Sequence, residues 1–102
     1  MTRAQTRQLA VAGELTIYTA SEWKPRLLAP LLEDEHLELD LGAVQELDTA
    51  GLQLLLLAKK EARARSLTLQ FCNHSPAVLE AIELCGLAGF FGDPILLHPT
   101  RP

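Results

Sequence analysis

The junction at residues 36–55, where an alternating strand pattern leads into a leucine-rich helix pattern, most constrains how this chain can fold. Leu37, Leu39 and Leu41 alternate with polar residues, which is the period-two pattern of a strand with one apolar face. Asp48 then stands where a helix needs an N-cap, because its carboxylate can accept an otherwise unpaired backbone N–H group. The sequence predicts a strand at 36–41 and a helix at 49–65, with Thr49 in the first helical turn.

The hydroxyl of Thr49 suits a binding switch. A phosphate there would add about −1.5 to −2 charges at pH 7. The start of a helix tolerates an anion, whereas the neighbouring Asp48 and the more distant Asp40 would repel it. Gly51 lacks a Cβ and would let another backbone approach closely. Taken alone, such a run is most often an ordinary N-cap followed by an ordinary first turn, and its weight comes from the segments around it.

The composition narrows the class of protein. A chain of 102 residues with 48% hydrophobic residues suits a single domain over 1–102, whose ends at 1–8 and 99–102 we expect to be flexible. The net charge of −4 argues against a nucleic-acid or anionic-membrane binder, since those need clustered Lys and Arg. The chain shows no signal-peptide core and no stretch of membrane-spanning length, so we expect a cytoplasmic protein without direct membrane insertion. Cys72 and Cys85 are interpreted as small buried hydrophobes rather than a disulfide.

Other segments alternate between strand and helix patterns. Ser21 is the expected cap of a helix whose end Pro30 should kink or shorten. Ser75 and Pro76 begin another helix, which should stop at Gly86. The remaining expected elements are strands at 9–11 and 14–18 joined by a tight turn at 12–13, a strand at 66–72, a turn at 89–94 and a terminal strand at 95–97. This order favours an α/β sheet, and the alternation within the strands favours helices mainly on one face.

The motifs, in their order and spacing, resemble the STAS domain family, the fold of anti-sigma factor antagonists, and in particular its stand-alone bacterial members. They are Gly13-Glu14-Leu15-Thr16, Leu39-Asp40-Leu41, the Asp-Thr-Ala-Gly-Leu run at 48–52, Leu67-Thr68-Leu69, Ser75-Pro76 and the segment 87–91. The resemblance implies a mixed four- to five-stranded sheet with helices mainly on one face. One departure is Thr16, where many family members carry an Asp near the phosphorylated residue.

The resemblance also implies a function. The position of Thr49 is often a Ser or Thr that a partner serine/threonine kinase phosphorylates, so the leading hypothesis is a regulatory protein-interaction module. Its partner would be an anti-sigma factor or a kinase-like regulator, and its oligomeric state stays open. The alternative is a STAS structural subunit of a bacterial phospholipid-transport ABC ATPase complex, in which phosphorylation need not matter. A ligand-sensing STAS domain is a third and weaker reading.

Helical geometry locates the surface that a partner could use. At about 100° per residue, Gly51, Leu55, Ala58 and Ala62 share one side of the central helix, which should pack on the sheet. Gln53, Lys60 and Arg63 lie on the opposite arc. Leu56 and Leu57 fall between, and some of their surface should be exposed unless a neighbouring segment covers it. The candidate partner surface comprises Asp48, Ala50, Gly51, Gln53, Leu56, Leu57, Lys60, Thr19 and Ser21, with Thr49 as the candidate phosphorylation site.

Catalytic and metal-binding patterns are missing from the sequence. His36, His74 and His98 lie far apart and lack the spacing of metal ligands. There is no glycine-rich phosphate loop, so we expect no cofactor. Asp40 and Asp48 have no activating base or oxyanion arrangement beside them. The sequence therefore predicts a binding protein and not an enzyme.

Overall fold

The fold is a small parallel sheet whose strands are joined by helices. The computed structural model describes residues 5–85. In chain order the elements are β1 (Thr6–Leu15), α1 (Ala20–Leu32), β2 (His36–Leu47), α2 (Thr49–Ala64), β3 (Leu69–Cys72) and α3 (Pro76–Cys85). The three strands pair in parallel in the order β1-β2-β3. A helix makes each crossover, as parallel neighbours require.

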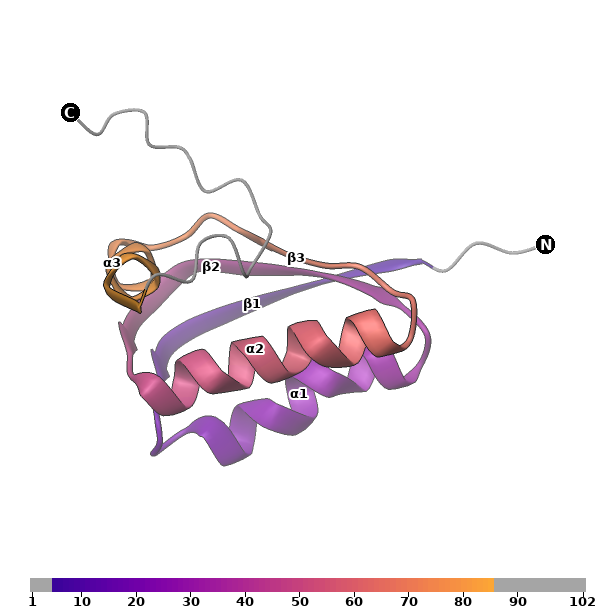
Figure 1. Cartoon of the computed structure of the whole chain (residues 1–102), viewed down its shortest axis with the longest axis horizontal. Helices are drawn as coiled ribbons and strands as arrows, with labels where there is room; N and C mark the ends of the chain where they lie inside the picture. The colour runs from indigo at the N-terminus through magenta and orange to yellow at the C-terminus, as the bar shows by residue number, and fades with distance from the viewer. Residues whose placement is uncertain (1–4, 86–102) are drawn as a thin grey trace.

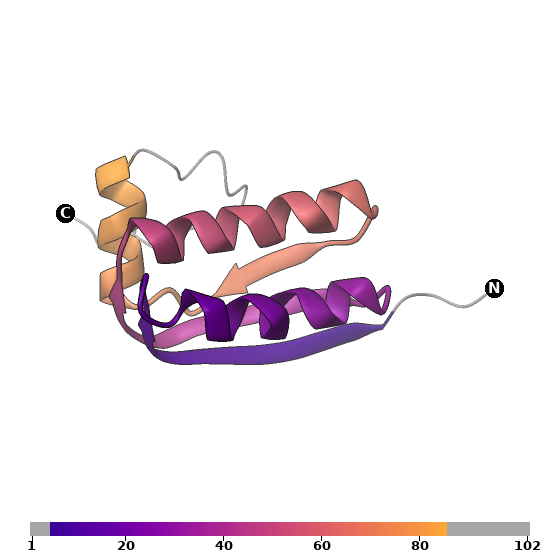
Figure 2. The same cartoon turned by 90° about the horizontal axis from the view of Figure 1, so that it is seen from below.

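Two layers enclose the hydrophobic core. Helices α1 and α2 lie side by side on one face of the sheet, while α3 runs across the end at which the strands finish (Figures 1 and 2). The alternating leucines Leu37, Leu39 and Leu41 are buried beneath the two helices, and Leu27 and Leu55 are buried from the helical side. The placement of α1 and α2 agrees with the prediction of helices mainly on one face.

The predicted hairpin near the N-terminus is wrong, because β1 is one strand that pairs with β2 in parallel. Gly13 adopts a left-handed φ of 81°, and the register shifts between Ala10 and Ala12 and between Gly13 and Glu14. The glycine therefore makes a bulge within the strand and does not reverse the chain. Residues 16–19 form a turn instead of continuing a strand, and residues 6–8, expected to be flexible, begin β1.

Helix α1 begins and ends differently from the prediction. Its N-cap is Thr19 and not Ser21, because the Thr16 carbonyl already accepts the N–H groups of Thr19 and Ala20. Pro30 does not shorten the helix, which continues to Leu32. The ring of Pro30 is buried, so its packing offsets part of the cost of the missing N–H group.

The remaining helix starts agree with the sequence patterns, while the strand lengths differ. The Ser75 hydroxyl accepts the Val78 N–H at 3.2 Å, and Pro76 is the first residue of α3, as predicted. Strand β2 extends beyond the predicted 36–41, and β3 is shorter than the predicted 66–72. The predicted stop at Gly86, the turn at 89–94 and the strand at 95–97 lie outside the described residues. A sheet of four to five strands, mixed in direction, therefore stays a prediction.

Candidate functional site

Thr49 lies at the carboxyl-terminal edge of the sheet. It is the first residue of α2, its surface is exposed, and the turn at residues 16–19 reaches the same end of the molecule. Parallel β-α units bring this about, since each strand ends where the next helix begins. The hydroxyl is thus accessible, in the first turn of a helix, where a negative charge is tolerated.

The carboxylate of Asp48 connects α2 to the turn that precedes α1. Its Oδ1 accepts the backbone N–H of Gly51 and its Oδ2 accepts the backbone N–H of Ile17, each at 2.9 Å. The Gly51 N–H, followed by the Ile17 N–H, lowers the pKa of the Asp48 carboxyl below its ordinary value of 3.8. Asp48 therefore remains negatively charged at neutral pH, directly beside the Thr49 position.

The turn at residues 16–19 has a fixed internal network. Thr19 Oγ1 accepts the Thr16 N–H and donates to the Glu14 carbonyl, both at 3.0 Å. The buried Thr16 hydroxyl donates to Glu14 Oε1 at 3.2 Å. The turn is therefore held by the hydroxyl at position 16, with the Glu14 carboxylate beside it.

The tip of this turn presents two apolar side chains that the sequence analysis missed. Ile17 is 67% exposed and Tyr18 is 85% exposed. The Asp48 carboxylate holds the Ile17 backbone, so these side chains lie near the start of α2. The pattern at 14–18 predicts a strand, so that pattern gives no reason to place both side chains at an exposed turn. Two large apolar residues directly before Thr19, the N-cap position of α1, are the available signal.

Gly51 lets α2 approach β1 closely. A Cβ built at this position would overlap the Leu15 carbonyl oxygen and lie 2.7 Å from the Leu15 carbonyl carbon and 2.8 Å from Leu47 Cδ1. Gly51 is buried, so it does not present a surface to a partner although the candidate surface includes it. Its role is to seat the first turn of α2 against the end of β1.

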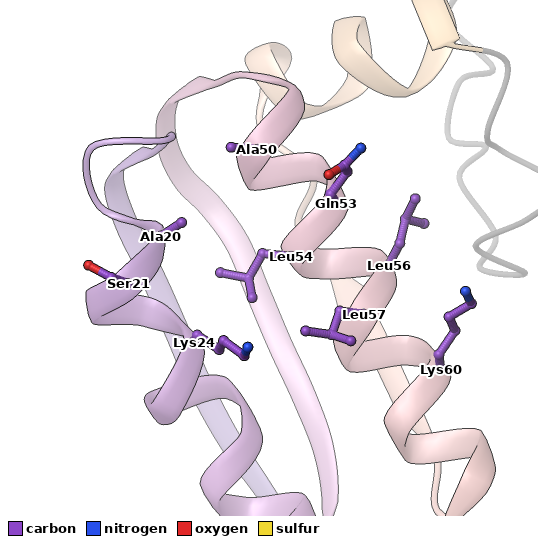
Figure 3. A pocket seen from close by; sticks show the side chains of 9 residues that line it. All are labelled: Ala20, Ser21, Lys24, Ala50, Gln53, Leu54, Leu56, Leu57 and Lys60. Atoms are coloured by element: carbon purple, nitrogen blue, oxygen red, sulfur yellow. The ribbon is translucent and has the colours of Figure 1, made fainter.

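A groove of about 660 Å³ runs between α1 and α2. Leu54 and Leu57 point from α2 toward α1, and Lys24 points from α1 toward α2 (Figure 3). Leu57 is 38% exposed and Leu56 is half-buried, which confirms that part of the leucine surface is exposed. The lining residues are Ala20, Ser21 and Lys24 on α1 and Ala50, Gln53, Leu54, Leu56, Leu57 and Lys60 on α2.

The groove unites six of the predicted surface residues and adds three that the sequence analysis missed. Ser21, Ala50, Gln53, Leu56, Leu57 and Lys60 line it, as do the unforeseen Ala20, Lys24 and Leu54. Thr19 and Asp48 lie just before the two helices and do not line the groove. Leu54 follows Ala50 by four residues and precedes Leu57 by three, so helical spacing alone could have identified this row.

Other polar groups lie apart from this surface. The Asp40 side chain points away from the core leucines on either side of it in β2, and its Oδ1 accepts the Gly42 N–H at 2.8 Å. His36 Nδ1 accepts the Thr68 N–H at 3.0 Å. Within residues 5–85, no three His, Cys, Asp or Glu side chains gather as a metal site. No helix in that part of the chain is long and apolar enough to cross a membrane.

These features define an α/β domain with an exposed hydroxyl and an apolar groove at the same end. The chain belongs to the STAS domain family, since the family described as "Mlab, STAS domain" matches residues 1–98. A solved structure of the anti-sigma factor antagonist SpoIIAA in its unphosphorylated form is similar, with a TM-score of 0.71 and 19% identity. The match covers 91% of this chain and 83% of SpoIIAA, and it supports the fold. No curated protein matches the chain.

Proposed function

We propose that this protein is a regulatory protein-interaction module, similar to anti-sigma factor antagonists, that is switched by phosphorylation of Thr49. The partner is an anti-sigma factor or a related serine/threonine-kinase-like regulator, which binds the start of α1 and the face of α2 that runs from Ala50 to Lys60. The observation that carries the proposal is the exposed Thr49 hydroxyl at the start of α2, next to an apolar groove that continues along the same helix.

Phosphorylation would oppose such an interface through charge. The phosphate brings about −1.5 to −2 charges next to Asp48, whose carboxyl is charged at neutral pH, as that of any aspartate with an ordinary or lowered pKa is. Docking would then have to remove two neighbouring anions from water at the edge of an apolar surface, which is costly unless the partner supplies cations. The unmodified protein binds, and the phosphorylated protein is released.

The test is an affinity capture from cell extract with wild type, Thr49→Ala and Thr49→Glu as baits. Thr68→Glu is the matched control, because Thr68 is also an exposed hydroxyl residue but lies before β3, at the other end of the sheet. The proposal expects a kinase-like or anti-sigma protein with wild type, Thr49→Ala and Thr68→Glu, and its loss with Thr49→Glu. A Thr49→Glu protein that binds as tightly as Thr49→Ala would exclude the switch.

A second candidate function is a structural subunit of a bacterial phospholipid-transport ATPase complex. One observation favours it: Thr49 is not among the residues that line the groove. A partner seated between α1 and α2 could therefore be held constantly, with Thr49 at the margin of the contact. Recovery of a transporter ATPase by both wild type and Thr49→Glu would support this role.

A further inference from the structure

The groove between α1 and α2 has a charge opposite to that of the whole chain. The chain carries a net charge of −4, yet the two charged residues among the described lining residues are Lys24 and Lys60. No described lining residue is acidic. Three acidic residues of the described chain are engaged elsewhere, since Glu33 and Glu35 pair with Arg7 and Glu61 pairs with Arg65.

The lysines lie on the two helices that form the groove. Lys24 projects from α1 toward the apolar row of Leu54 and Leu57, while Lys60 projects from α2 beside Leu56 (Figure 3). The α2 part of the lining runs from Ala50 to Lys60, which corresponds to about 15 Å of helix, or roughly three turns. An apolar strip of this length with ammonium groups on both helices matches an amphipathic helix with acidic flanks.

We infer that the groove binds one amphipathic helix of the partner protein. Its apolar stripe contacts the exposed Leu57 over a groove floor formed by Leu54, which is only 6% exposed, and its Glu or Asp residues meet Lys24 and Lys60. The inference rests on the proposed function, because it specifies the partner that the same surface takes. Such a helix would present its apolar residues at positions i, i+4 and i+7, the usual spacing of a helix that binds in a groove.

The geometry favours a helix over an extended peptide or a second copy of this chain. The groove is lined by helices, whose backbone N–H and C=O groups are already paired internally, so an added strand would find no partner for its own backbone. A helix satisfies its backbone within itself. Two copies that docked groove to groove about a twofold axis would place lysines against lysines, which is unfavourable.

The probe is a pair of stapled helical peptides that differ only in charge. Both carry Leu at i, i+4 and i+7, and one carries Glu where the other carries Lys along the flanks. Stapling is needed because unaided helices of this length are marginal in water. Binding to the full-length protein is measured by fluorescence anisotropy of the labelled peptide, at low and high salt, up to about 1 mM protein.

The expected result is binding of the acidic peptide that weakens as salt rises, with weaker or no binding of the basic peptide. The double variant Lys24→Glu/Lys60→Glu should weaken the acidic peptide about tenfold and strengthen the basic one. Arg63→Glu is the matched control, since Arg63 is an exposed cation of α2 outside the groove, and it should change binding by less than about twofold.

Three results would overturn the inference. They are no binding of the acidic peptide, equal binding of both peptides to the wild type, and a loss with Arg63→Glu as large as that with the double variant. The capture with Thr49→Glu is independent of these peptides. If the acidic peptide does not bind but Thr49→Glu abolishes capture of the partner, only the inference of an acidic partner helix is excluded. If the peptide binds but Thr49→Glu has no effect on capture, only the phosphorylation switch is excluded.

Discussion

Replacement of Gly51 by Ala tests the central packing contact of the site. The new methyl group would meet the backbone of β1, at 2.7 Å from the Leu15 carbonyl carbon, and Leu47 Cδ1 at 2.8 Å. A side chain could rotate away, but the Leu15 carbonyl belongs to a strand paired with β2. Relief therefore requires α2 to move off the sheet or the strand to shift.

Two opposing effects determine how much Gly51→Ala changes the free energy of unfolding. In an exposed helix interior, Gly→Ala stabilises by about 1 kcal/mol because the unfolded chain loses freedom. Overpacking a closed contact costs about 1–3 kcal/mol, and overlap with a backbone atom belongs at or above the upper end of that range. The net expectation for Gly51→Ala is a loss of roughly 2 kcal/mol, which lowers the midpoint of thermal unfolding by about 8–16 °C in a domain of this size.

Urea unfolding monitored by tryptophan fluorescence measures this effect. Trp23 is the one tryptophan of the chain and is buried, so its emission reports on the packing of α1. Gln53→Ala is the control, because Gln53 is exposed on the same helix and its change should stay within about 0.5 kcal/mol. If Gly51→Ala is as stable as the wild type or more stable, helix propensity outweighs any steric overlap at this position, and α2 does not approach the Leu15 carbonyl as closely as described.

Three further predictions concern the same region. Asp48→Asn should lower the free energy of unfolding by about 1 kcal/mol, because the amide has one acceptor oxygen where the carboxylate has two, so either the Gly51 or the Ile17 N–H loses its partner. Because the pKa of Asp48 is lower in the folded protein, its carboxylate stabilises the fold fully above the unfolded value near 3.8, and this stabilisation is lost as the pH falls through the folded-state pKa. The thermal midpoint of the variant should therefore decline less than that of the wild type across this acid range. Leu55→Ala should lower the free energy of unfolding by about 2–5 kcal/mol and Leu57→Ala by less than about 1 kcal/mol, since Leu55 is fully buried and Leu57 is 38% exposed. Equal urea midpoints for the two variants would contradict the packing described. Thr49→Glu should leave stability unchanged or raise it by a few tenths of a kcal/mol, because an anion in the first turn of a helix is favoured; a clear drop in its thermal midpoint would mean that the hydroxyl has a structural role.

Local sequence patterns predict the strand β2 and the helix α2, which lie at the centre of the fold. Alternation placed Leu37, Leu39 and Leu41 inside, and helical spacing placed Leu55 and Ala58 against the sheet, as the structure confirms. The caps at Asp48 and Ser75 were equally visible, since a cap depends on one side chain and the next three backbone N–H groups. Such features need only neighbours in the chain, so they can be read before the fold is known.

Pairing between distant segments was decided by the tertiary structure alone. Ala12-Gly13 is compatible with a tight turn or with a bulge, and only the parallel partner β2 selects the bulge and exposes Ile17 and Tyr18 at the following turn. The same holds for the groove, because Lys24 and Leu54 become neighbours only when α1 and α2 lie side by side on one sheet face. Which residues are apolar, capping or charged can be read from the chain itself. Which of them share a surface depends on strand register and helix packing, because these are set by contacts between residues far apart in the chain.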